Sequence, residues 1–218
     1  MIVPKISKEE VNAFPVVVFE GQITVVDNVA KAQKALAALS KEKLVGIDTE
    51  TKPSFTRGQY HKVALLQIST ENHCYLFRLN KQPFSAELAA FLSNPDIRKV
   101  GLALRDDFAG LNRHHRFVPA NVVDLQSVVK DYGIMELGLQ KIFAILFRQK
   151  ISKSQRLTNW ESTELTEQQQ RYASTDAWAV LRIYKQLQQE NKLTRKQLVS
   201  LMEQVAIAEQ SNINIQQP

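Results

Sequence analysis

The chain has 218 residues, 44% of them hydrophobic, which is enough for one large or two small domains with an ordinary buried core. It carries 28 lysines and arginines against 22 aspartates and glutamates, giving a net charge of +6 and a pI near 9.4. This balance permits a polyanionic partner, because lysine and arginine displace counterions from phosphates. The single cysteine, Cys74, excludes an intramolecular disulfide and a cysteine-based zinc cluster.

Membrane association is not expected. Charges interrupt the N-terminal stretch MIVPKISKEE, and the longest apolar runs, PVVVF and IFAILF, are far too short to cross a bilayer. A lone cysteine also fits a reducing compartment. We therefore expect a cytoplasmic protein.

The first half of the chain predicts an antiparallel meander. Residues 1–20 read as an irregular lead-in, after which ITVV predicts a short strand and Asp27 is expected to cap a helix over residues 28–39. LVGID follows as a buried strand. VALLQIS and CYLFRL predict two more strands, and the polar turn TENH between them favours an antiparallel hairpin.

The second half alternates strands and helices, which favours parallel pairing with helices packed on the sheet. RKVGLAL and NVVDL read as strands, whereas SAELAAFL, DDFAGLNRH, LQSVVKDY and LQKIFAILF have helical spacing. A long helix follows over residues 166–190, with Thr166 and Gln169 as a candidate capping box. These elements predict one α/β domain with a mixed sheet over residues 21–190, a helix over 191–209 packed on it, and a disordered tail at 210–218.

Two pairs of side chains are predicted to share a face. In a strand side chains alternate, so Asp48 and Glu50 point to one side at the strand's carboxyl end while Thr49 points away. Tyr172 and Asp176, four apart on the long helix, share a face there. Two adjacent carboxylates repel each other unless a cation lies between them, and carboxylate oxygens hold hard divalent cations. Taken alone, each pair is more often surface charge or an ordinary packed aromatic residue.

A further acid lies where a helix is expected to begin beside the end of a strand. Asp106 and Asp107 are neighbours there; either could be the N-cap, and spacing does not choose between them. Asp124 could also be a ligand, although a cap for the following helix is the simpler interpretation. Four acids converging on one point would predict a nuclease, because two Mg²⁺ or Mn²⁺ ions about 3.5–4 Å apart clamp the attacking and leaving oxygens of a phosphodiester.

Basic residues gather in RQKISKSQR, where Arg148, Lys150, Lys153 and Arg156 occur with no acidic residue among them. For an isolated run of this kind a solvated basic loop is the simpler interpretation.

The segments IDTETKP, VALLQI, KVGLALRDDFAGL and LTNWESTELTEQQQRYASTDAWAVLRIY, in this order, closely resemble the DEDDy group of 3′–5′ exonucleases, which have a ribonuclease H-like fold. The likeness covers about residues 23–189 and is nearest to exonuclease domains of the Werner helicase type, with ribonuclease D more distant. It implies that Asp48, Glu50, Asp107 and Asp176 hold two divalent metal ions, Mg²⁺ or Mn²⁺, while Tyr172 orients the attacking water. It also selects Asp107 over Asp106.

The resemblance implies that the partner is a nucleic-acid strand with a free 3′ end, from which nucleoside monophosphates are released. In the relatives the basic segment precedes the tyrosine helix near the path of the strand, so Lys153 and Arg156 become candidate phosphate contacts. Trp160 could stack on a base or lock its loop to the core. Lys52 and Arg57 are weaker candidates for nucleic-acid contact.

Substrate and partners follow from the resemblance in outline only. Likeness to the Werner type favours DNA over RNA, and without a P-loop of the form GxxxxGK[ST] any helicase partner would be a separate protein. A non-catalytic nucleic-acid-binding module on the same fold is the alternative; a purely structural interaction domain would leave the acids unexplained. The sequence leaves the oligomeric state open.

Overall fold

A six-stranded mixed sheet forms the centre of the protein. The structure, a computed structural model, describes residues 2–56, 58 and 60–215. The strand order is β2-β5-β4-β3-β6-β7, in which β3, β4 and β5 pair antiparallel while β2 with β5, β3 with β6, and β6 with β7 pair parallel. The bounds are β2 (Gln22–Val26), β3 (Leu44–Thr51), β4 (Val63–Ser69), β5 (His73–Arg78), β6 (Arg98–Gly101) and β7 (Val122–Asp124). The predicted α/β class, meander and hairpin are confirmed.

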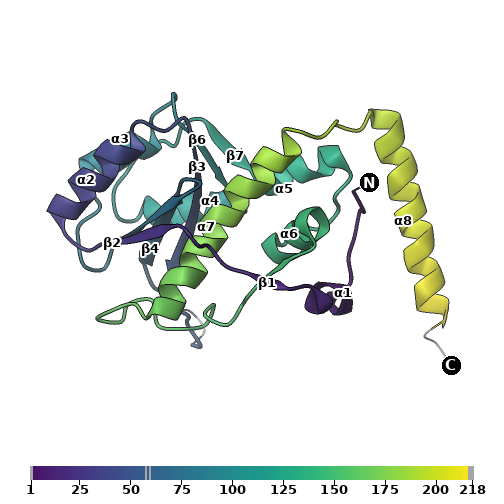
Figure 1. Cartoon of the computed structure of the whole chain (residues 1–218), viewed down its shortest axis with the longest axis horizontal. Coiled ribbons are helices and arrows are strands. Elements are labelled where there is room, and N and C mark those ends of the chain that lie inside the picture. The colour runs from purple at the N-terminus through teal and green to yellow at the C-terminus, as the bar shows by residue number, and fades with distance from the viewer. Residues whose placement is uncertain (1, 57, 59, 216–218) are drawn as a thin grey trace.

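Helices cover both faces of this sheet (Figure 1). On one face, α2 (Val29–Leu39), α3 (Ala86–Leu92) and α4 (Leu104–Leu111) share a hydrophobic cluster with Val45 and Ile47 of β3. Across the other face runs α7 (Glu167–Leu187), which packs Ala173 and Ala177 against apolar residues of β4 and β5. Because the sheet is covered on both sides, every residue of β4 is buried, which explains why VALLQIS shows little polar alternation.

Beyond β7 the chain builds a second cluster against the far half of α7. It comprises α5 (Leu125–Val128), the 3-10 helix η1 (Val129–Tyr132), α6 (Leu139–Phe147) and the short strand β8 (Lys150–Ile151). Ile142 and Phe143 of α6 are fully buried there with Ile183 of α7. The capping box predicted at the start of α7 is present: the Thr166 hydroxyl accepts from the backbone of Gln169, whose side chain accepts from the backbone of Thr166.

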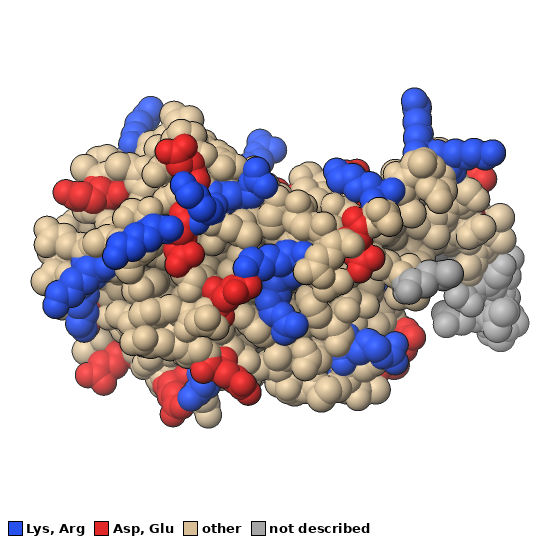
Figure 2. All heavy atoms as spheres, turned by 45° about the horizontal axis from the view of Figure 1, so that its top comes forward, with Lys and Arg blue, Asp and Glu red and all other residues tan. Residues whose placement is uncertain are grey.

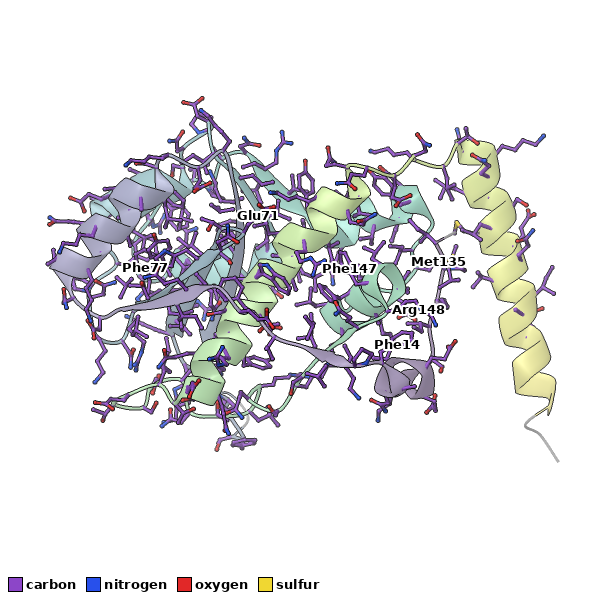
Figure 3. The ribbon with its side chains drawn as sticks, in the orientation of Figure 1. Phe14, Glu71, Phe77, Met135, Phe147 and Arg148 are labelled. Carbon is purple, nitrogen blue, oxygen red and sulfur yellow. The ribbon has the colours of Figure 1, made fainter. Side chains whose placement is uncertain are left out.

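The prediction of an irregular lead-in over residues 1–20 is wrong. Helix α1 (Lys8–Ala13) begins with a capping box between Ser7 and Glu10, and β1 (Val16–Val17) pairs parallel with β8. This N-terminal segment is fastened to α6, because Ile6 and Val11 are buried against Ala144. At the carboxyl end of α6 the Arg148 guanidinium lies over the Phe14 ring, 4.9 Å from its centre. Figure 3 labels both residues.

The C-terminal helix α8 spans Arg195–Ile215 and stands beside the body of the protein (Figure 1). It continues past residue 209, so the prediction of disorder is wrong for residues 210–215; residues 216–218 lie outside the described part. The expected packing on the domain is limited: Leu201 lies against Gly133, while Val199, Met202 and Ile207 are about half exposed or more. In the described part of the chain, no helix is both long and apolar enough to cross a membrane.

Two local predictions also need correction. Asn28, not Asp27, caps α2 by accepting from the backbone of Lys31, while Asp27 forms an ion pair with the Lys31 ammonium at 2.9 Å. Strand β6 ends at Gly101, earlier than RKVGLAL predicts, because the chain turns there into α4.

Lysine and arginine side chains are spread over the face shown in Figure 2, with acidic side chains among them. On this face the positive net charge therefore forms no single uninterrupted patch.

Candidate functional site

Three of the predicted acids meet between β3 and α7. Asp48, Glu50 and Asp176 each offer a carboxylate oxygen, and these oxygens all lie within 4.8 Å of one another. The strand and the helix approach closely because Gly46 has no side chain: a Cβ there would lie 1.9 Å from the carbonyl oxygen of Ala177. The predicted pairing of side chains on one face of the strand with one face of the helix is therefore what the structure shows.

Asp107 is not one of this group of three. Its carboxylate accepts a hydrogen bond from the hydroxyl of Thr49, whose side chain points away from Asp48 and Glu50 on β3. The charge of Asp107 is nevertheless near enough to raise the pKa of both Asp48 and Glu50. The structure thus places Asp107 beside the three acids without bringing it into contact with them.

The position of Asp107 is set by Asp124, which lies at the end of β7, twenty residues after Leu104. Neither Asp106 nor Asp107 is an N-cap, because α4 begins at Leu104, after Ala103 in a left-handed conformation (φ 59°). The Asp124 carboxylate accepts from the backbone of Ala103 at 3.0 Å and of Leu104 at 2.9 Å. It also caps α5, by accepting from Gln126, as the simpler interpretation predicted. Asp106 is exposed in the first turn.

Burial and mutual repulsion make these carboxyl groups hard to ionise. Burial, followed by the charges of neighbouring acids, raises the pKa of Glu50 to about 9 and that of Asp48 well above its ordinary range. Burial likewise raises the pKa of Asp107 to about 6 and that of Asp176 to about 7, while a hydrogen bond opposes the rise in each case. A ligand that supplies positive charge would stabilise the ionised form of these four carboxyl groups and so bind favourably.

Tyr172 lies one helical turn before Asp176, near enough for its hydroxyl to lower the pKa of the Asp176 carboxyl group. Burial, followed by the charges of Asp176 and Glu50, raises the pKa of Tyr172 above its ordinary value. The phenol therefore remains protonated at neutral pH and acts as a hydrogen-bond donor.

The donor set fits hard divalent cations. Every offered atom is a carboxylate oxygen, the ligand type that Mg²⁺, Mn²⁺ and Ca²⁺ prefer. Gln67, directly opposite Asp48 on β4, is fully buried, and no described residue hydrogen-bonds with either atom of its side-chain amide. Unpaired polar atoms beside repelling carboxyl groups are unfavourable in the metal-free protein, and a bound ion with its waters would relieve both.

Two of the predicted basic residues lie beside the acids. Lys153 and Arg156 are exposed and line the same cleft as Tyr172 and Asp176. Their charges reach the acids, because Lys153 lowers the pKa of Asp176 and Arg156 lowers that of Glu50.

The other nucleic-acid candidates are placed differently. Trp160 is fully buried and packs 6.0 Å from the Tyr172 ring between centres, so it has no surface for stacking on a base and instead locks its loop to the core. The Lys52 ammonium is engaged by Glu161 at 3.6 Å. Arg57 lies outside the described residues.

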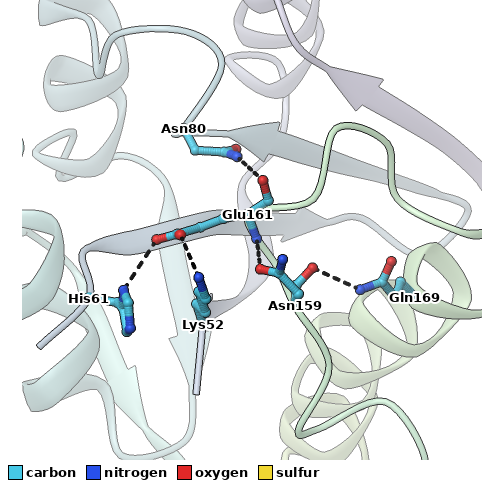
Figure 4. Close-up of polar contacts among 6 residues, drawn as sticks. All are labelled: Lys52, His61, Asn80, Asn159, Glu161 and Gln169. Atoms are coloured by element: carbon cyan, nitrogen blue, oxygen red, sulfur yellow. Dashed lines mark hydrogen bonds and ion pairs between the residues drawn. The ribbon is translucent and has the colours of Figure 1, made fainter. Parts of the chain in front are cut away.

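Glu161 is a residue that the sequence reasoning missed. Figure 4 shows it joining the segment after β3 to the segment before α7: its carboxylate lies 3.6 Å from both Lys52 and His61. Its backbone accepts from Asn80 and donates to Asn159, whose carbonyl accepts from Gln169 of α7. These contacts fix the position of β3, which carries Asp48 and Glu50, relative to α7, which carries Asp176. No spacing rule in the sequence signals them, because the partners come from four separate segments.

The comparisons with known proteins agree with this geometry. The sequence profile of the 3′–5′ exonuclease family matches residues 23–192. The chain is 35% identical over 157 residues to the bifunctional 3′–5′ exonuclease/ATP-dependent helicase WRN of Mus musculus, covering 68% of this chain and 11% of that protein. It is 29% identical over 190 residues to a 3′–5′ exonuclease of Arabidopsis thaliana, covering 80% and 66% of the two chains. The chain thus spans only part of these relatives.

Solved structures show the same fold. The exonuclease domain of Aedes aegypti Nibbler superposes with a TM-score of 0.72 at 22% identity, covering 87% of this chain and 99% of that one. Escherichia coli RNase D, described as an exoribonuclease involved in structured RNA processing, gives a TM-score of 0.70 at 24% identity, covering 77% and 44%. The fold is therefore the ribonuclease H-like fold predicted from the resemblance. Because the family profile matches most of this chain and the acidic group is in place, this chain belongs to the 3′–5′ exonuclease family.

Proposed function

We propose that the protein is a metal-dependent exonuclease that removes nucleoside monophosphates from the 3′ end of a nucleic-acid strand. The observation that carries the proposal is the meeting of Asp48, Glu50 and Asp176 within 4.8 Å between one strand and one helix, in a chain that belongs to this family. The proposed domain covers residues 21–190.

In this proposal Asp48, Glu50, Asp107 and Asp176 hold two divalent cations, Mg²⁺ or Mn²⁺. When bound, two such ions lower the pKa of a water and offset charge on the departing 3′ oxygen. Asp107, whose carboxylate accepts from the Thr49 hydroxyl in this structure, would join the set by exchanging that hydrogen bond for an ion. Tyr172 donates its hydrogen bond to orient the attacking water, since its raised pKa makes it a poor base.

Phosphate binding falls to Lys153 and Arg156, two exposed cations that line the same cleft as Asp176 and lower the pKa of the acids. Their charges offset the repulsion between a polyanionic strand and a carboxylate-rich site. Lys52, already paired with Glu161, is a weaker candidate for the same role.

We propose DNA as the preferred substrate over RNA. The support is the resemblance to Werner-type exonuclease domains, together with higher identity to the mouse helicase-exonuclease, 35%, than to the exoribonuclease RNase D, 24%. The mouse relative combines exonuclease and helicase in one protein, and here unwinding would come from outside residues 1–218.

The test uses 5′-labelled single strands of DNA and of RNA with the same sequence. Each is incubated with Mg²⁺, with Mn²⁺ and with EDTA, and the Asp176→Asn variant serves as the control for contaminating nucleases. We expect a metal-dependent ladder of products shortened from the 3′ end, faster on DNA, and none from the variant. Retardation without cleavage in every metal would instead support the non-catalytic binding module. A ladder that is equal on both strands would overturn the DNA preference alone.

A further inference from the structure

A cleft of about 740 Å³ extends away from the acids on the Tyr172 side. Its volume is within the range of roughly 300–1,000 Å³ that buries small-molecule ligands, enough for about one or two nucleotides. It is walled by α1, by β1 and β8, by the start of α6 and by α7. We call it the basic cleft, since Lys8, Lys141, Lys150, Lys153 and Arg156 line it and Asp176, at one end, is the sole acidic residue among the lining residues.

The N-terminal wall of the basic cleft is fixed along its length. The backbone of Met135 donates to the Pro4 carbonyl at 2.8 Å, and Lys150 donates to the Pro15 carbonyl at 2.9 Å. The Lys150 ammonium also donates to the carbonyl of Asn12 at 2.6 Å, on the last turn of α1. With Val11 buried against α6, the wall is a permanent part of the molecule.

The charges on this wall differ in how freely they can bind an anion. Lys141 is engaged by Glu136 at 2.9 Å, so its charge is largely offset. The Lys150 ammonium has a neutral carbonyl as its partner, so that contact does not offset its charge. Lys8 is exposed in the first turn of α1, and within the described residues no carboxylate forms an ion pair with it.

Between these cations part of the lining is apolar, beside the polar residues Asn12, Gln140 and Ser152. Val16 is 56% exposed, an unusual state for a valine on a strand, and it shares the lining with Leu139 and Ile151. A surface that combines apolar side chains with separate cations suits a single strand, whose bases need apolar contact and whose phosphates need positive charge. A duplex keeps the faces of its bases stacked inside the helix, so they could not reach the apolar part.

We propose that the basic cleft holds the single strand immediately upstream of the 3′ nucleotide, with Lys8 and Lys150 binding its phosphates and Val16 and Leu139 contacting its bases. This inference rests on the proposed exonuclease function and deepens it. It assigns a substrate-binding role to the N-terminal segment, which lies before the part of the chain matched by the exonuclease family. It also predicts that the enzyme distinguishes substrates by the length of the single strand at the 3′ end.

The experiment compares single-stranded DNA of two nucleotides with DNA of ten nucleotides, at low salt, for wild type and for Lys8→Gln, Lys8→Glu and Lys8→Arg. We expect Lys8→Gln to lower kcat/KM on the ten-nucleotide strand by about fivefold, mainly through KM, and Lys8→Glu to lower it further. The loss on the dinucleotide should be smaller, and Lys8→Arg should restore the wild-type value. The matched control is Lys34→Gln, an exposed lysine on α2 at the opposite end of the molecule (Figure 1), for which no change is expected.

Binding gives an independent readout. For the ten-nucleotide strand bound to the Asp176→Asn variant, measured by fluorescence anisotropy, adding Lys8→Gln should reduce the slope of log affinity against log salt by about 0.7, the value for one phosphate on a single strand. Lys8→Glu is not expected to unfold α1, because a negative charge in the first turn interacts favourably with the helix dipole. Thermal unfolding of each variant checks separately that the fold is intact. A Lys8→Glu variant with wild-type KM and salt slope overturns the inference. If wild type instead makes no ladder from any strand, the proposed function itself fails, and the salt slope still tests the cleft.

Discussion

The hydroxyl of Tyr172 is a hydrogen-bond donor in a group of acceptors. Since burial and the neighbouring carboxylates raise its pKa, it keeps its proton at neutral pH. We expect Tyr172→Phe to lower the single-turnover rate by roughly 100-fold, because the attacking water loses its orientation, and to change metal affinity little. Rapid-quench kinetics measures the single-turnover rate, and titration with Mn²⁺ by calorimetry measures the metal affinity. A variant that cleaves at the wild-type rate would remove Tyr172 from the mechanism.

The pKa shifts of the acids predict how the metal-free protein responds to pH. Asp107 and Asp176 have pKa values of about 6 and 7 in the folded protein, above the ordinary aspartate value of about 4 expected after unfolding. Between about pH 4 and pH 7 the folded state therefore binds more protons than the unfolded state. The stabilisation that protonation of Asp107 and Asp176 gives the folded state is complete below about pH 4 and is lost as pH rises through 6 and 7.

In EDTA we therefore expect the midpoint of thermal unfolding to fall between pH 5 and pH 8. The loss should be on the order of 2 kcal/mol, which corresponds to roughly 4–8 °C in a chain of this size. The double substitution Asp107→Asn, Asp176→Asn should make the curve less steep, leaving the part that Asp48 and Glu50 contribute, and saturating Mg²⁺ should reverse its slope. An EDTA curve with the same slope in wild type and in the double variant would show that these acids are already ionised without metal.

The sequence predicted those contacts at the site that depend on local geometry. Alternation along a strand places Asp48 beside Glu50, and a single helical turn places Tyr172 beside Asp176. The contact between Thr49 and Asp107 could not be predicted, because it depends on where α4 begins, and that is set by the distant carboxylate of Asp124. The same limit applies to Trp160, whose burial depends on packing against α7 rather than on its neighbours in sequence.

At the scale of elements, the contact between β3 and α7 determines whether the site forms. Gly46 brings the two elements together, because no side chain separates it from the Ala177 carbonyl. We expect Gly46→Ala to push α7 away from β3, with a loss of more than about 3 kcal/mol of unfolding free energy and of nearly all exonuclease activity. Denaturant titration and the ladder assay measure these losses. Gly138→Ala is a matched control for the unfolding free energy alone, since a Cβ there meets no atom within 4 Å but the residue lines the basic cleft.

The elements that escaped prediction are short and depend on distant partners. Strands β1 and β8 have two residues each and exist only because they pair with one another across most of the sequence. Helix α1 has one local signal in the sequence, the capping box of Ser7 and Glu10. The helix has only six residues, which is too short for an apolar periodicity to support that signal. The longer elements were predicted from periodicity, because each buries a face of its own.

For the whole molecule, the two ends of the chain differ in how much they contribute. A chain that begins at Phe19 loses the buried side chains of Ile6 and Val11 and the pairing of β1, so we expect a loss on the order of 3 kcal/mol. A chain that ends at Leu193 loses α8, whose described side chains are mostly exposed, and should stay within about 1 kcal/mol of wild type. Denaturant unfolding of both truncations checks this ranking, and equal losses at the two ends would contradict it.

The pairing of β1 with β8 also bears on how the enzyme is made. While the protein leaves the ribosome, residues 16–17 have no partner until residues 150–151 emerge, and Asp48 and Glu50 have none until Asp176 follows. The complete acidic group can therefore form only when synthesis is nearly finished. An interrupted translation product that stops before α7 lacks Asp176 and so cannot assemble the acidic group.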